Sequence, residues 1–172
     1  AIIDTSNKSN QPMQIGKHVI VFNGVIFNYR ELRSALLKKG HSFSSSGDTE
    51  VIIRSYIEYG SSCVNYLDGV FAFSIYDTEN KKLFLARDRI GIKPLYFLHE
   101  SGQLYFSSHM KGIIKNMVKK KVNPIALNYQ FTLHSVVPAP HTIIDNIQKL
   151  EPGHTITVHK SGRIDKNRYF NI

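Results

Sequence analysis

The stretch that decides the fold is Val-Ile-Val-Phe-Asn-Gly, residues 19–24. Four apolar residues, three of them β-branched, predict a buried strand. The Asn23-Gly24 pair predicts a tight turn at its end, because glycine takes a positive φ without steric cost and asparagine tolerates it. Such a turn exposes backbone N–H groups beside the Asn23 amide, and converging donors of this kind stabilise an oxyanion. The alternative interpretation is an ordinary β-hairpin turn.

Downstream of this strand the hydrophobic pattern is first helical and then extended. Leu32 and Leu36 share one helical face, with Asn28 as the expected N-cap and Gly40 as the glycine after the last turn. The expected order is helices over 29–40, 48–60 and 61–68, strands over 70–76, 83–87, 94–98 and 103–107, helices over 111–118 and 123–131, and a last hairpin over 155–169. Strands that cluster rather than alternate with helices predict an α+β fold.

Composition sets the class of protein. The chain has 172 residues, 42% of them hydrophobic and 20% charged, which are values of a globular domain. A single cysteine excludes a disulfide framework, and no apolar run is long enough to span a membrane, so we expect a cytoplasmic protein. The net charge of +9 is spread over dispersed lysines. We therefore expect neither a nucleic-acid nor a membrane partner, although nucleic-acid binding is a hypothesis that the charge alone permits.

Several short motifs follow the Asn-Gly pair in a fixed order. They are Gly-Asp-Thr-Glu at 47–50, Leu-Asp-Gly-Val-Phe-Ala-Phe at 67–73, Leu-Ala-Arg-Asp-Arg-Ile-Gly-Ile-Lys-Pro-Leu-Tyr at 85–96 and Lys-Leu-Glu-Pro-Gly-His at 149–154. This ordered set resembles the N-terminal class II glutamine amidotransferase domain of asparagine synthetases, over essentially the whole chain. The resemblance implies a four-layer αββα sandwich of the Ntn-hydrolase type, with two antiparallel sheets between helices. We expect it to be incomplete at its start.

The resemblance also implies that the chain divides into two regions. Residues 1–121 would be the amidotransferase-like domain without its extreme N-terminus, and residues 122–172 a linker with the start of a synthetase-like region. Glutamine would be the substrate, with a synthetase domain as partner in cis or in trans. Homo-oligomers are a further expectation, because missing first strands would leave a sheet edge unpaired.

In the family that it resembles, an N-terminal cysteine attacks the glutamine amide with its own α-amine as base. The resemblance implies that Asn23 and Gly24 form the oxyanion hole and that Asp48 holds the α-ammonium of glutamine. The competing role of Asp48 is a plain N-cap. Arg87, Asp88 and Arg89, with Gly91 and Pro94, predict a buried ion network that positions a loop; a purely structural salt-bridge cluster is the simpler interpretation.

The sequence departs from the family at several positions. Ala1 carries no nucleophile, and Cys63, which we expect to be half-buried and structural, is the only thiol. Val25 and His109 stand where the family has glutamates, and an apolar side chain at position 25 cannot contact a substrate ammonium. The histidines show no metal-ligand spacing, and no nucleotide-binding motif is present, so we expect no cofactor here. ATP and Mg²⁺ would belong to a synthetase domain.

Two hypotheses follow. The first is the glutaminase portion of an asparagine synthetase-like enzyme, which supplies ammonia for ATP-dependent amidation of aspartate or a related carboxylate. This chain alone would then be inactive, because the covalent path needs the missing nucleophile. The second is a non-catalytic, degenerate amidotransferase fold that serves as an interaction module.

Overall fold

The computed structural model describes residues 3–117 and 119–171. The chain forms two compact units: residues 1–93 with 153–172, and residues 94–152. The predicted boundary at residue 122 does not coincide with the limits of either unit. The boundary between an amidotransferase-like domain and a synthetase-like region stays a prediction.

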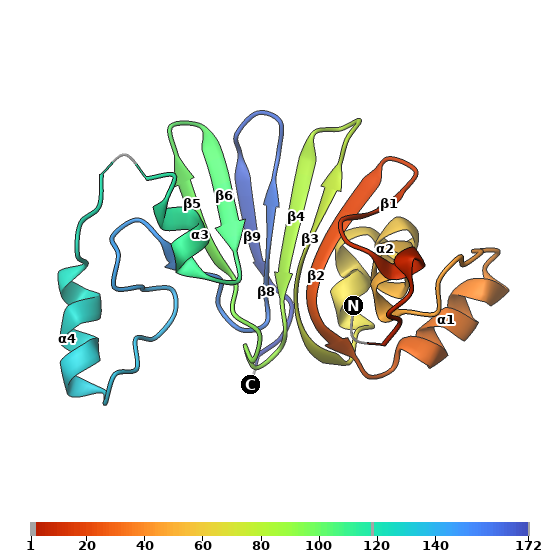
Figure 1. Cartoon of the computed structure of the whole chain (residues 1–172), viewed down its shortest axis with the longest axis horizontal. Coiled ribbons are helices and arrows are strands. Elements are labelled where there is room, and N and C mark those ends of the chain that lie inside the picture. Colours follow the sequence, from red (N-terminus) through yellow and green to blue (C-terminus); the bar gives the residue numbers. More distant parts are fainter. Residues whose placement is uncertain (1–2, 118, 172) are drawn as a thin grey trace. The chain divides into compact units, whose positions relative to one another are not determined.

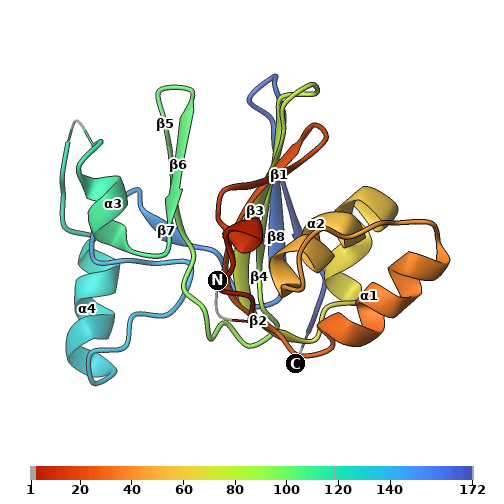
Figure 2. The same ribbon diagram turned by 45° about the vertical axis from the view of Figure 1, so that its right-hand side comes forward.

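The first unit is built on a six-stranded antiparallel sheet in the order β1-β2-β3-β4-β8-β9. Its strands are β1 (Met13–Ile15), β2 (His18–Ile26), β3 (Gly69–Asp77), β4 (Lys82–Arg87), β8 (His154–Val158) and β9 (Ile164–Arg168). Helices α1 (Tyr29–Lys38) and α2 (Asp48–Tyr59) cover one face of this sheet (Figure 1, Figure 2). The predicted last hairpin, β8–β9, therefore completes the sheet that the N-terminal strands begin.

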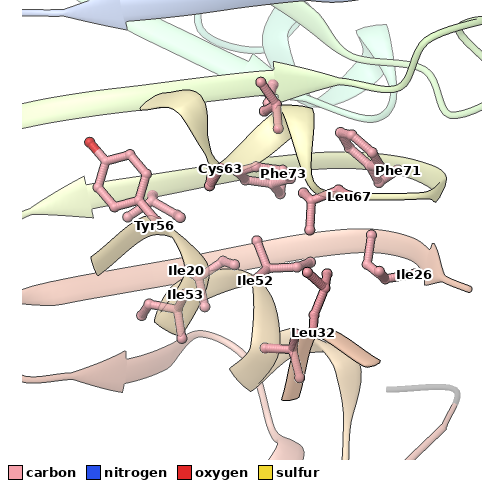
Figure 3. Packing of buried hydrophobic residues seen from close by; sticks show 14 of the residues in the cluster. Ile20, Ile26, Leu32, Ile52, Ile53, Tyr56, Cys63, Leu67, Phe71 and Phe73 are labelled. Atoms are coloured by element: carbon pink, nitrogen blue, oxygen red, sulfur yellow. The ribbon is translucent and has the colours of Figure 1, made fainter. Parts of the chain in front are cut away.

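The core of this unit lies between the sheet and α2. Ile52, Ile53 and Tyr56 of α2 meet Ile20 of β2 and Phe73 of β3 (Figure 3). Each fully buried aliphatic or aromatic side chain of this kind stabilises the fold by about 1.5–3 kcal/mol. The apolar side chains predicted to share one face of the helix over 48–60 are therefore the ones that pack against the sheet.

The first helix also begins at the predicted residue, but its N-terminus lacks the predicted side-chain cap. Asn28 stands at the N-cap of α1 without capping it. Its side chain instead bridges to the segment before β3: its Nδ2 donates to Tyr66 O (2.9 Å) and its Oδ1 accepts from Asp68 N (3.0 Å). The predicted capping box is therefore wrong, because a tertiary contact takes the amide. Gly40 has the positive φ expected after the helix, at 90°.

The second unit contains a three-stranded sheet in the order β6-β5-β7. Its elements are β5 (Tyr96–Glu100), β6 (Gln103–Ser107), α3 (Met110–Ile114), α4 (Pro124–Thr132) and β7 (Gln148–Lys149). Leu98, Ile113, Met117 and Ile147 form its core. The predicted hairpin and both helices are confirmed, although α3 is shorter than expected. Two antiparallel sheets, each packed with helices, match the α+β class predicted from the sequence.

Candidate active site

The Asn23-Gly24 pair lies inside strand β2 and not in a turn. β2 continues to Ile26, and its register places Asn23 opposite Ala72 and Gly24 opposite Phe71 of β3. The predicted turn is therefore wrong. The glycine is needed for a different reason: a Cβ built on Gly24 would lie 2.0 Å from the carbonyl oxygen of Val70, and its φ is +149°. β2 and β3 approach each other so closely here that a side chain cannot fit.

The direction of the Gly24 N–H follows from its neighbours. Phe71 N–H donates to the Asp88 carboxylate (3.2 Å) and Phe71 C=O accepts from Asp88 N–H (2.8 Å), so the polar backbone groups of Phe71 face away from β2. In an antiparallel ladder, the residue opposite such a residue turns its own N–H to the outer side of its strand. The N–H of Gly24 therefore points away from β3, to the side of β2 on which β1 pairs with residues 18–20.

Two other N–H groups point to the same edge, and each has an acceptor. The N–H of Phe22 donates to the side-chain oxygen of Gln11 (2.6 Å), and the N–H of Ile26 donates to Oδ2 of Asp48 (3.0 Å). Gly24, which is buried, lies between these two residues on the strand. A backbone N–H that is held in a fixed direction is the kind of group that can bind a developing oxyanion.

Asp48 is placed by the start of α2. It is the first residue of that helix, after Gly47, and is 4% exposed. Burial raises the pKa of its carboxyl above the usual value, even though the N–H of Ile26 favours the charged form. The predicted N-cap role of Asp48 is wrong, because Gly47 is the N-cap of α2 and the Asp48 carboxylate accepts from the N–H of Ile26 in β2. The predicted contact with the α-ammonium of glutamine stays a prediction. The N–H groups of Gly24 and Ile26 are two residues apart, roughly 7 Å along the strand.

Two further carboxylates fix the serine-rich loop before Asp48, and the sequence reasoning missed both. Glu50, fully buried, accepts from Ser44 N (3.0 Å), Ser45 N (2.6 Å) and Ser45 Oγ (2.7 Å). Burial alone would raise the pKa of Glu50, but these hydrogen bonds outweigh it and lower the pKa. Asp4 accepts from the N–H and hydroxyl of Ser46, each at 2.9 Å. The three serines ahead of Asp48 were the available signal.

The loop after β4 winds around a single buried carboxylate. Asp88, 0% exposed, accepts the N–H groups of Ile90 (3.2 Å), Ile92 (3.0 Å) and Lys93 (2.9 Å), besides that of Phe71. The Arg87 guanidinium donates to the carbonyl oxygens of Gly91 (2.7 Å) and Lys93 (2.8 Å). The predicted ion network stays a prediction, and these hydrogen bonds join both charged groups to the backbone of this loop. The reason is that the tight loop turns its N–H and C=O groups inward.

Other members of the predicted loop have different surroundings. The guanidinium of Arg89 lies over the ring of Phe170 at 5.3 Å and donates to Leu67 O (3.4 Å). Gly91 has a φ of 73°, as a sharp turn requires. Pro94 begins the second unit. Within the first unit, Asp88 is bound to Phe71, the residue opposite Gly24.

Three predicted positions bear on catalysis and substrate contact. Asn23 is exposed, and strand alternation puts its side chain with that of Val25 on the sheet face away from α1 and α2. Val25 is half-buried. Cys63 is fully buried rather than half-buried, and burial raises the pKa of its thiol. A thiol in such a place is a poor nucleophile.

The described residues show neither a metal-binding group nor a membrane-spanning helix. No cluster of three or more His, Cys, Asp or Glu side chains could hold a metal ion in residues 3–117 and 119–171. No helix in these ranges is long and apolar enough to cross a membrane.

Comparisons with known proteins show the family of the chain. The family model described as "Glutamine amidotransferase domain" matches residues 1–170. Two asparagine synthetases (glutamine-hydrolysing) of Bacillus subtilis, numbers 3 and 1, are 34% and 37% identical over 100% and 99% of the chain. The chain spans only 28% and 27% of their lengths.

A solved structure of another amidotransferase has a similar fold. The glutamine phosphoribosylpyrophosphate amidotransferase of B. subtilis superposes with a TM-score of 0.65 at 18% identity, over 96% of this chain and 33% of that one. This likeness confirms the predicted Ntn-hydrolase-like α+β sandwich. From the family match over nearly its whole length, we conclude that the chain belongs to the glutamine amidotransferase domain family.

Proposed function

We propose that the chain is the glutamine-binding portion of an asparagine synthetase-like enzyme, in which ammonia released from glutamine serves the ATP-dependent amidation of aspartate or a related carboxylate. The observation that carries the proposal is the direction of the Gly24 N–H, which points away from β3, two residues along β2 from the Ile26–Asp48 hydrogen bond. The family match and the asparagine synthetases among the relatives support the same substrate.

Each residue has a chemical task in this proposal. The Gly24 N–H, with the Asn23 amide, would hold the oxygen of the substrate amide as it gains negative charge. Loss of one such donor typically costs 10²–10³-fold in rate. Asp48 would hold the α-ammonium of glutamine through a charge-assisted hydrogen bond. The spacing of roughly 7 Å between the two N–H groups on that edge is comparable to the length of a glutamine side chain.

The 172-residue chain alone would not hydrolyse glutamine. Its only thiol is Cys63, which is fully buried, with a pKa raised by that burial. The nucleophile of a covalent mechanism would have to come from a residue that these 172 do not contain. We expect no ammonia release above the buffer rate when this chain is incubated with glutamine.

A titration tests the proposed binding. Because the chain alone should not turn over its ligand, calorimetry can compare glutamine with 4-carbamoylbutanoate, which is glutamine without the α-amino group. We expect glutamine to bind more tightly, and Asp48→Asn to remove most of that difference. The matched control is Asp68→Asn, an exposed aspartate in the same unit. Equal binding of the two ligands by the unaltered chain would contradict the role of Asp48.

Val25 favours a second candidate, the non-catalytic interaction module. A half-buried valine beside Asn23 offers nothing to an ammonium group. Val25→Glu separates the candidates: a gain in glutamine affinity indicates a pocket that has lost one contact, whereas unchanged, undetectable binding indicates a fold kept for interaction.

A further inference from the structure

The side chain of Gln11 continues the hydrogen bonding of β1 beyond the end of that strand. β1 and β2 are paired up to Met13, which lies opposite Ile20. Extended by two residues, this register places Gln11 opposite Phe22. There the Phe22 N–H donates to the side-chain Oε1 of Gln11 (2.6 Å), which takes the place of a backbone carbonyl oxygen. Gln11 therefore holds the peptide group of Phe22 without a paired strand.

The use of a side chain at this point matters for the next N–H on the same side of β2, that of Gly24. A β1 longer by two more residues would place Ser9 opposite Gly24, and the Ser9 carbonyl oxygen would accept the Gly24 N–H. Residues Asn7–Ser9 instead form the 3₁₀ helix η1, in which Ser9 N–H donates to Ser6 O (3.0 Å). A side-chain acceptor at Phe22 thus holds β2, and the ladder between β1 and β2 ends before Gly24.

Asp48 holds β2 on the other side of Gly24. Its Oδ2 accepts the N–H of Ile26 (3.0 Å), so Gly24 lies two residues from each of two N–H groups that side-chain oxygens hold. Because peptide groups are planar, fixing the groups on both sides restricts the direction of the N–H between them. A donor that is already directed need not turn as negative charge develops on a substrate oxygen, and this is what makes an oxyanion hole effective.

We propose that Gln11 is a positioning residue for the oxyanion hole. This inference rests on the proposed function, in which the Gly24 N–H and the Asn23 amide hold the oxygen of the substrate amide. Gln11 acts on that oxygen through the peptide group of Phe22 and does not contact it. Its effect belongs to the transition state, in which the oxygen becomes negative, and it leaves the binding of ground-state glutamine unchanged.

Steady-state kinetics of glutamine hydrolysis by the native-length protein test this role. Gln11→Met keeps the length of the side chain and removes the acceptor of the Phe22 N–H. We expect kcat for ammonia release to fall about tenfold or more while KM stays unchanged, since an interaction of the transition state alone is weakened. An unchanged kcat overturns the inference, and so does a rise in KM that accounts for the whole loss in kcat/KM.

Gln14→Met is the matched control. Gln14 lies in β1 itself, is exposed, and donates from its side chain to the neighbouring Gly16 O (3.0 Å). The same change of side chain at this position should leave both kcat and KM unchanged. An equal loss of kcat in the two variants overturns the inference, because the effect would then follow from any change at this side of the sheet.

Gln11→Glu separates positioning from support of the fold. The introduced carboxyl keeps an oxygen that accepts the Phe22 N–H, so at low pH, where it is neutral, kcat should stay close to that of the unaltered protein. When it ionises, it places a negative charge roughly 7 Å from the oxygen that Gly24 holds, since Phe22 and Gly24 are two residues apart. Repulsion should then lower kcat about tenfold relative to the unaltered protein.

The pH profile of this variant decides the question even if Gln11→Met fails to fold. We expect the ratio of its kcat to that of the unaltered protein to fall between about pH 4 and about pH 8, as the introduced carboxyl ionises. A constant ratio overturns the inference. A kcat at low pH as small as that of Gln11→Met also overturns it, because the acceptor oxygen would then have restored nothing.

Amide exchange keeps this inference apart from the proposed function. In the native-length protein, exchange at Phe22 should accelerate in Gln11→Met and not in Gln14→Met, and unchanged exchange contradicts the hold of Gln11 on β2 whether or not glutamine is hydrolysed. Absence of hydrolysis by the unaltered native-length protein contradicts the proposed function. Hydrolysis whose kcat is the same in Gln11→Met contradicts the positioning role alone.

Discussion

Phe71 and Gly24 lie opposite each other in adjacent strands, but the polar backbone groups of Phe71 are both bound to Asp88. This relationship leaves the N–H of Gly24 on the outer edge of β2. The loop motif around Asp88 and the Asn-Gly motif are distant in sequence, and one residue of β3 connects them. Asp88 therefore holds Phe71, the residue opposite the candidate oxyanion donor.

Gly24→Ala should destabilise the fold by about 3 kcal/mol or more, because its Cβ would lie 2.0 Å from Val70 O and 2.8 Å from Phe71 Cα. Gly16→Ala is the control, since Gly16 also has a positive φ, 56°, but its added Cβ would meet nothing within 4 Å. The control should cost about 1 kcal/mol. Urea denaturation measures both, and equal losses would refute the close approach of β2 and β3.

Asp88→Asn should destabilise the protein by about 3 kcal/mol or more, because an amide nitrogen would replace an oxygen that accepts backbone N–H groups. Amide exchange should accelerate at Phe71 and Ile92 before the rest of the sheet. Asp68→Asn, at an exposed aspartate, should change neither quantity. Unchanged exchange at Phe71 in the Asp88 variant would show that the carboxylate does not hold β3.

Asp48→Asn should change the dependence of stability on pH. The pKa of Asp48 is raised in the folded state by burial, so its ionisation opposes folding. Its contribution is most favourable below the usual value of 3.8 and is lost as the pH rises through the folded pKa. The variant cannot ionise and should gain stability relative to the wild type between pH 3 and pH 7. A constant difference in unfolding free energy over that range would contradict this.

Cys63 should resist thiol reagents in the folded protein, because it is fully buried and the pKa of its thiol is raised. Labelling by a disulfide reagent should proceed at the rate of unfolding and become fast in urea. Cys63→Ser should cost more stability than Cys63→Ala, since an unpaired hydroxyl in that core costs about 1–3 kcal/mol. Rapid labelling in buffer would show that the site opens locally.

Local sequence patterns predicted most of the elements. The stripe of Ile52, Ile53 and Tyr56 predicted a packed helix, and the apolar run 70–76 predicted the central strand β3. Those predictions hold because helix and strand periods are properties of neighbouring residues. The predictions of a turn at Asn23-Gly24 and of a helix cap at Asn28 are wrong for the same reason. Gly24 packs against Val70 and Asn28 bonds to Tyr66 and Asp68, which local propensity cannot register.

The sequence by itself determined the family, the α+β class and the identity of Asn23, Gly24 and Asp48 as candidate site residues, since these depend on residue type and order. Only the tertiary structure decided which way the N–H of Gly24 points. It also decided that Asp88 binds backbone and that Cys63 is sealed in the core. Hydrogen-bond direction and burial depend on partners tens of residues away, and the chain acquires them only when β2, β3 and the loop after β4 come together.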